Sequence, residues 1–107
     1  MRRMAGLLVI AAAGLAGCQS LASPSEHEYT LTTHCGIHEL EHDGSWYVRD
    51  GGALDDGQGN PPEGWDNPSQ QGELHIEGDT ATFTDDAGHR ETFTLREGAS
   101  GPLQACD

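Results

Sequence analysis

Three short segments in the second half of the chain alternate apolar and polar residues with a period of two. They cover residues 73–77, 80–84 and 92–96, and Gly78-Asp79 and Asp86-Ala87-Gly88 separate them. A period of two is typical of β-strands that bury one face, and turns this tight join antiparallel neighbours. The sequence therefore predicts a three-stranded antiparallel meander, which sets the fold class as all-β.

A second pair of strands is predicted on either side of the turn pair Asp43-Gly44. Residues 31–38 alternate ahead of this turn. After it, Trp46 and Val48 share one face of a strand, and Tyr47 lies on the other. We expect the face of Trp46 and Val48 to be buried, because two apolar side chains then point the same way.

The predicted fold is a small antiparallel barrel or sandwich of five or six strands with one disulfide. Two sheet faces must bury the apolar side chains together. Residues 50–71 hold so many glycine, proline, asparagine and aspartate residues that we expect no regular element there. The predicted core consists of Leu31, Ile37, Trp46, Val48, Leu74, Ile76, Phe83, Phe93 and Leu95.

The first eighteen residues have the pattern of a secretion signal. Arg2 and Arg3 precede an apolar run that ends in Leu15-Ala16-Gly17 before Cys18. This ending resembles a bacterial lipoprotein signal, in which the cysteine is lipidated and becomes the new N-terminus. Two acyl chains give a stable membrane anchor. We expect a protein anchored by lipid on the extracytoplasmic face of the cell membrane; the alternatives are an ordinary secretion signal or an uncleaved anchor.

The domain organisation follows from this signal. Residues 1–17 are the predicted signal peptide, 18–28 a flexible tether and 29–107 a β domain. Cys35 and Cys106 are then left as an even pair in an oxidising compartment. A disulfide between them closes a loop of about 70 residues, worth about 4 kcal/mol in the chain-entropy model. Two buried free thiols are the alternative.

The charge of the chain is one-sided. All eighteen acidic residues follow the signal, the sequence has no lysine, and three arginines remain in the mature part, whose net charge is about −15. Such a surface repels nucleic acid and anionic lipid head groups, so we expect neither as a partner. It attracts divalent cations and basic proteins. The plainer interpretation is an acidic surface that keeps the protein soluble.

Two groups of residues are candidate ligands for calcium or zinc. His34 and His38 recur at a spacing of four, but along a strand that spacing spans roughly 13 Å, so help from neighbouring strands is required. Asp55, Asp56 and Asn60 form an incomplete calcium loop. The alternatives are a solvated strand face or pH sensing for the histidines, and ordinary turn chemistry for the acidic loop. No cofactor is expected otherwise.

Trp65 follows two prolines and a glycine and is the candidate ligand-contacting aromatic. We expect it to fold back as a lid over one end of the barrel; exposed, it would stack on a sugar ring or a peptide of a glycan or protein partner. The chain contains no GxSxG, no HExxH and no glycine-rich phosphate loop. Enzymatic activity is therefore not expected.

Two segments carry a resemblance. The run HCGI at residues 34–37 and the run GNPPEGW at residues 59–65 are similar to a group of small secreted or lipid-anchored proteins of high-GC Gram-positive bacteria. The resemblance implies the domain boundary but no activity and no site residues. The sequence as a whole predicts a small binding or interaction module on the cell surface, with divalent-cation binding as the alternative.

Overall fold

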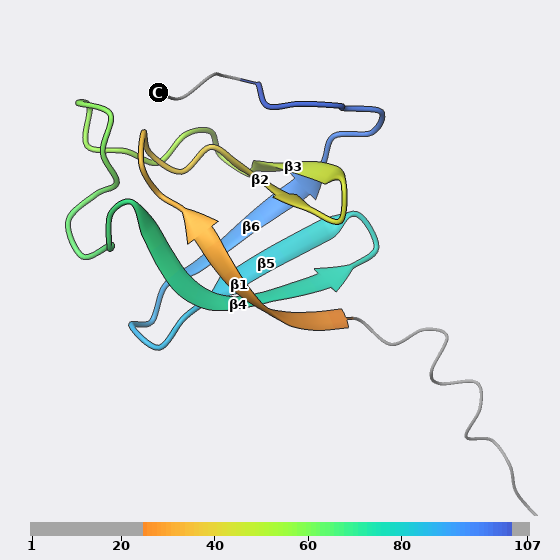
Figure 1. Ribbon diagram of the computed structural model, residues 1–107, viewed down its shortest axis with the longest axis horizontal. Helices are drawn as coiled ribbons and strands as arrows, with labels where there is room; N and C mark the ends of the chain where they lie inside the picture. The colour runs from red at the N-terminus through yellow and green to blue at the C-terminus, as the bar shows by residue number, and fades with distance from the viewer. Residues whose placement is uncertain (1–24, 104–107) are drawn as a thin grey trace, which may run out of the picture.

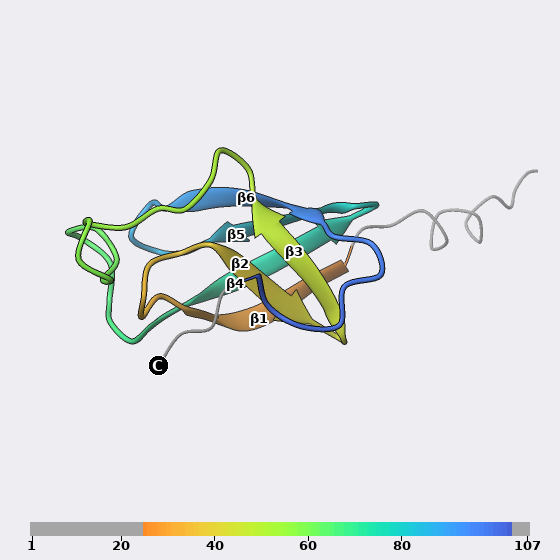
Figure 2. The same ribbon diagram turned by 90° about the horizontal axis from the view of Figure 1, so that it is seen from above.

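The computed structural model describes residues 25–103, and the chain forms six strands there without a helix. Every paired neighbour is antiparallel, and the order β1-β4-β5-β6-β3-β2 curls into a nearly closed barrel (Figures 1 and 2). The strands are β1 (Ser25–Thr32), β2 (Glu39–His42), β3 (Ser45–Arg49), β4 (Ser69–Glu77), β5 (Thr80–Thr84) and β6 (Arg90–Leu95). The predicted all-β class is confirmed, and the six antiparallel strands lie within the expected five or six.

The meander β4-β5-β6 is the part of the fold that the sequence predicts best. Its two turns lie at Gly78-Asp79 and at residues 85–89, as expected. The first strand is longer than predicted, because β4 already begins at Ser69 and pairs with β1 through Thr32↔Ser69. The irregular segment is therefore shorter and ends at Pro68.

The prediction that Trp46 and Val48 face the core is wrong. Tyr47 is the buried residue of β3, with 6% of its surface exposed, whereas Trp46 and Val48 are only half-buried. Tyr47 is paired with Leu40 on β2 and with Leu95 on β6. Because alternate residues of a strand face opposite sides, an inward Tyr47 turns both neighbours outward.

The remaining core lies inside the barrel. Phe83 and Phe93 are fully buried on β5 and β6, and Trp65 packs against the cluster from the loop before β4. The buried cluster consists of Leu31, Ile37, Leu40, Tyr47, Leu74, Ala81, Phe83 and Phe93. Ile76 and Leu95, which were predicted as core, are partly buried against it.

The strand predicted over residues 31–38 is also corrected. β1 ends at Thr32, and the chain then turns, with positive φ angles of 75° at Cys35 and 89° at Gly36. A Cβ at position 36 would lie 2.6 Å from the Cβ of Asp55, so only glycine allows this close approach. Ile37 forms an isolated bridge with Leu54.

The N-terminal boundary of the domain lies earlier than predicted. Residues 25–28, which were assigned to the tether, belong to β1 and pair with β4. Cys18, Cys106 and the predicted signal peptide lie outside the described residues. In the described part of the chain, no helix is long and apolar enough to cross a bilayer.

Candidate functional site

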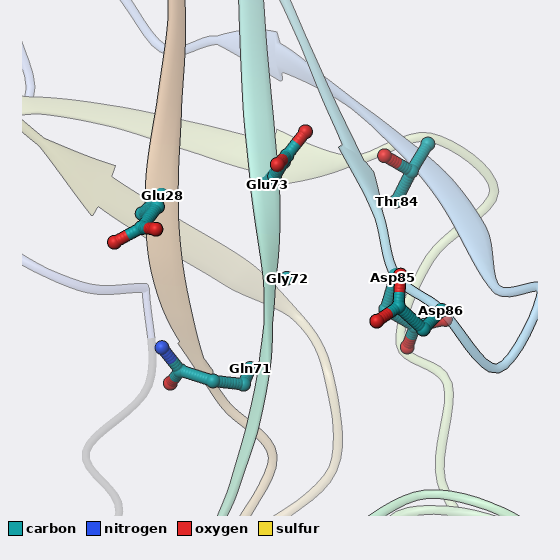
Figure 3. A pocket seen from close by; sticks show the side chains of 7 residues that line it. All are labelled: Glu28, Gln71, Gly72, Glu73, Thr84, Asp85 and Asp86. Carbon is teal, nitrogen blue, oxygen red and sulfur yellow. The ribbon is translucent and has the colours of Figure 1, made fainter.

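A hollow of about 290 Å³ opens on the outer face of β1, β4 and β5 (Figure 3). Gly72 lies between its two sides. Glu28 comes from one side, and Asp85 and Asp86 follow β5 on the other. The complete lining consists of Glu28, Gln71, Gly72, Glu73, Thr84, Asp85 and Asp86.

The pairing register brings two of the lining carboxylates together. Glu28 on β1 is directly opposite Glu73 on β4, and Glu73 is opposite Thr84 on β5. Both glutamates are exposed and lie at outward positions of their strands. Like charges directly opposite each other destabilise a sheet. The lining contains four carboxylates and no positive side chain, so the hollow suits a positively charged group.

The inward side of Gly72 has no room for a side chain. A Cβ at this position would lie 2.3 Å from the carbonyl oxygen of Thr84 and 2.5 Å from Cζ of Phe83. These distances are too short for any side chain. The absence of a side chain therefore lets β4 pass close over the Phe83 ring and the end of β5.

A buried polar cluster supports the wall of the hollow at Asp85. The side chain of Asp85 is 1% exposed, and its Oδ2 lies 2.6 Å from Nδ1 of His89 and accepts a 2.9 Å hydrogen bond from Nε2 of Gln70. Its Oδ1 accepts the backbone N–H groups of Ala87 and His89. Gln70 in turn accepts the N–H of Asp66 at 2.7 Å. Asp85 thus joins the β5–β6 turn to β4 and to the preceding loop.

The environment of Asp85 keeps it ionised. Burial by itself raises the pKa of this carboxyl, but the hydrogen bonds from the His89 ring and from the N–H groups of His89 and Ala87 outweigh burial and hold the pKa below its usual value. Asp85 is therefore a fixed negative charge beside the hollow.

Trp65 packs beside this cluster, on the ring of His89. Its ring stacks on His89 with centroids 3.7 Å apart and planes at 17°, and on Phe83 at 6.2 Å. The side chain is only half-buried but packs against the core. Because two neighbouring rings already contact Trp65, its main contribution is to hold the loop on the barrel.

In the predicted calcium loop, the aspartate side chains accept hydrogen bonds from the backbone of the loop itself. Oδ1 of Asp56 accepts the N–H groups of Gln58 and Asn60, and Oδ1 of Asp55 accepts the N–H of Gly57. The hydrogen bonds that Asp56 accepts, the one from Gln58 most strongly, lower the pKa of its carboxyl. The geometry matches the turn chemistry that was the alternative interpretation.

The two histidines of the predicted metal site, His34 and His38, lie in the turn between β1 and β2 and not on one strand. His34 is exposed, and Nε2 of His38 lies 2.6 Å from the carbonyl oxygen of Cys35. Within residues 25–103, no three His, Cys, Asp or Glu side chains are grouped so that they could hold a metal ion. Calcium or zinc binding stays a prediction.

The sequence interpretation missed the residues around the hollow. The sequence predicts Glu28 as part of the tether and Glu73 as a strand position, and it gives Asp85 no role. The spacing of Asp85 and His89 around a glycine-containing turn is a signal that could have indicated their contact. The comparisons add no relative: no family model, no curated protein and no solved structure matches the chain.

Proposed function

We propose that the chain is a lipid-anchored, extracytoplasmic binding module that receives positively charged groups of a partner in the hollow around Gly72. The observation that carries this proposal is the direct opposition of Glu28 and Glu73 in a hollow that no cation lines. A lysine or arginine head group entering there would relieve the repulsion between the two carboxylates. The signal ending at Cys18 supports the extracytoplasmic location.

The charge and size of the hollow favour this class of partner. The chain carries a formal net charge of −13, which speeds the encounter with a basic partner and discourages acidic ones. A volume of about 290 Å³ lies at the small end of ligand pockets, so it fits one side chain rather than a drug-sized molecule. We therefore propose a basic protein or peptide, and not an apolar ligand, as the partner.

The test is a calorimetric titration of the chain, in a nonionic detergent and EDTA, with a tetralysine peptide. We expect the double substitution Glu28→Gln and Glu73→Gln to weaken binding about tenfold, which corresponds to about 1.4 kcal/mol. The matched control is Glu63→Gln with Glu97→Gln, which changes the net charge equally at two exposed positions away from the hollow. Equal loss in both double variants would show that binding depends on net charge alone.

The alternative function, divalent-cation binding, has a separate readout. Thermal unfolding is measured in EDTA and then with calcium or zinc at constant ionic strength. A saturable rise in Tm that is specific to one ion and lost in Asp55→Asn with Asp56→Asn, or in His34→Gln with His38→Gln, would favour the alternative. The basic-partner proposal expects no ion-specific rise.

The lipid anchor makes a prediction of its own. Replacing Cys18 with serine removes the acceptor sulfur, so we expect the protein either to remain unprocessed or to leave the detergent-rich phase on phase partition. Processing and detergent partition of the variant are compared with those of the unchanged protein. A variant that is cleaved normally and still partitions with detergent would contradict anchoring through Cys18.

The Cys35–Cys106 disulfide is a further part of the proposal. Its reduction should destabilise the domain by about 4 kcal/mol in the chain-entropy model, because the bridge closes a loop of about 70 residues. Urea unfolding with and without reductant, with Cys35→Ser as the matched variant, measures the difference. Identical midpoints for the oxidised and reduced protein would rule out a stabilising bridge.

A further inference from the structure

The barrel has one seam, between β1 and β2, that strand pairing does not close. These strands stand at the two ends of the sheet order, and within residues 25–103 no ladder joins them. A side chain bridges the seam instead: Oη of Tyr29 on β1 donates a 2.8 Å hydrogen bond to the carbonyl oxygen of Glu41 on β2. Burial raises the pKa of Tyr29 to about 12, so this donor stays protonated over the physiological range.

Two histidines face each other across the same seam. The ring centroids of His27 on β1 and His42 on β2 lie 4.5 Å apart with planes tilted by 44°. The Tyr29 ring meets His42 edge-on at 6.2 Å. The pair is only partly exposed to water. Neutral imidazoles pack well at this distance, whereas two imidazolium ions repel each other there more strongly than in bulk water.

The charges around the pair can balance one added proton but are poorly placed for two. Nε2 of His42 lies 3.4 Å from Oδ2 of Asp43. On β1, Glu26 contacts His75 of β4 at 3.4 Å. The residues opposite His27 and His42 on the paired strands are Leu74 and Ser45, which carry no charge. Further titratable groups on the same and neighbouring elements include Glu28 on β1, Glu41 on β2, Tyr47 on β3, Glu73 on β4 and Asp79 in the β4–β5 turn.

We propose that protonation of both His27 and His42 on acidification opens the seam between β1 and β2. The first proton is balanced by Asp43. The second places a like charge 4.5 Å away, between the two described strands at the ends of the sheet order. Opening separates the two rings and breaks the Tyr29–Glu41 hydrogen bond. This inference does not depend on the proposed binding function.

A double-mutant cycle isolates the pair from every other titrating group. Phenylalanine keeps a ring without the charge, so His27→Phe, His42→Phe and the double variant are compared with the unchanged chain by urea unfolding in EDTA, at pH of about 7.5 and about 5. We expect the coupling between the two positions to fall by about tenfold in the unfolding equilibrium constant at the lower pH. Equal coupling at both pH values would overturn the proposal.

A second measurement needs no variant. Nuclear Overhauser contacts between the Tyr29 and His42 rings report the closed seam directly. In the unchanged chain we expect these contacts to be lost at the lower pH while contacts within the core at Phe93 persist. His75→Gln, which removes a histidine outside the seam, should leave this loss in place. Ring contacts that persist at the lower pH would overturn the proposal.

Discussion

Replacing Asp85 with alanine is expected to destabilise the domain by about 3–5 kcal/mol, the range measured when one partner of a buried, hydrogen-bonded pair is removed. The carboxylate is 1% exposed and accepts hydrogen bonds from Gln70, from the N–H groups of Ala87 and His89, and from the His89 ring. Alanine leaves these donors without their acceptor. The N–H of Ala87 is exposed, but the donors of Gln70 and His89 are part-buried, and each unpaired buried donor costs about 1–3 kcal/mol. Urea unfolding at neutral pH measures the loss.

The same residue sets a pH dependence with a definite sign. Because the pKa of Asp85 is lower in the folded than in the unfolded chain, its contribution is complete above the unfolded value of about 3.9 and is lost as the pH falls through the folded value. In Asp85→Asn this acid-sensitive part should disappear. Asp86→Asn is the matched control, since Asp86 is exposed and next in the chain. An unchanged acid limb in Asp85→Asn would contradict this assignment.

Replacing Phe83 with alanine should cost about 3–5 kcal/mol, as for other buried Phe→Ala changes. Phe83 is fully buried, and Trp65 stacks against it. A Cβ at position 72 would lie 2.5 Å from Cζ of the Phe83 ring, so the ring leaves room only for glycine there. The variant should also lose near-ultraviolet circular dichroism from Trp65, because the ring loses its support.

The matched control for Phe83 is Leu103→Ala. Leu103 is apolar but 59% exposed, so its truncation should change stability by less than about 0.5 kcal/mol. Equal effects of the two substitutions would mean that Phe83 is not a core residue of the folded chain in solution.

The elements that could be predicted from the sequence are those that local pattern determines. The meander was predicted correctly, because a period of two and a two-residue turn are both visible within a few residues. The buried face of β3 was predicted wrongly. Trp46, Tyr47 and Val48 are all apolar, so the choice of buried face depends on pairing of Tyr47 with Leu40 and Leu95, which sequence spacing does not reveal.

The candidate site shows the same limit more strongly. Glu28 and Glu73 are 45 residues apart in the chain, and only the register of β1 against β4 brings them opposite each other. The acidic loop was predicted as a cation site because Asp55 and Asp56 are adjacent in the sequence. In the structure, their side chains accept hydrogen bonds from backbone N–H groups of the same loop. The sequence predicts that Trp65 folds back on the barrel, and in the structure its side chain packs against the core.

The most direct test of the central claim is to map where a positively charged group binds. Amide chemical shifts of the chain are followed during titration with N-acetyl-lysine methylamide, with N-acetyl-glutamate methylamide as the control. Recognition by the hollow predicts shifts concentrated at Gly72, Glu73 and Thr84, with the control producing none. Shifts spread evenly over the acidic surface, or centred on the loop at Asp55 and Asp56, would contradict it.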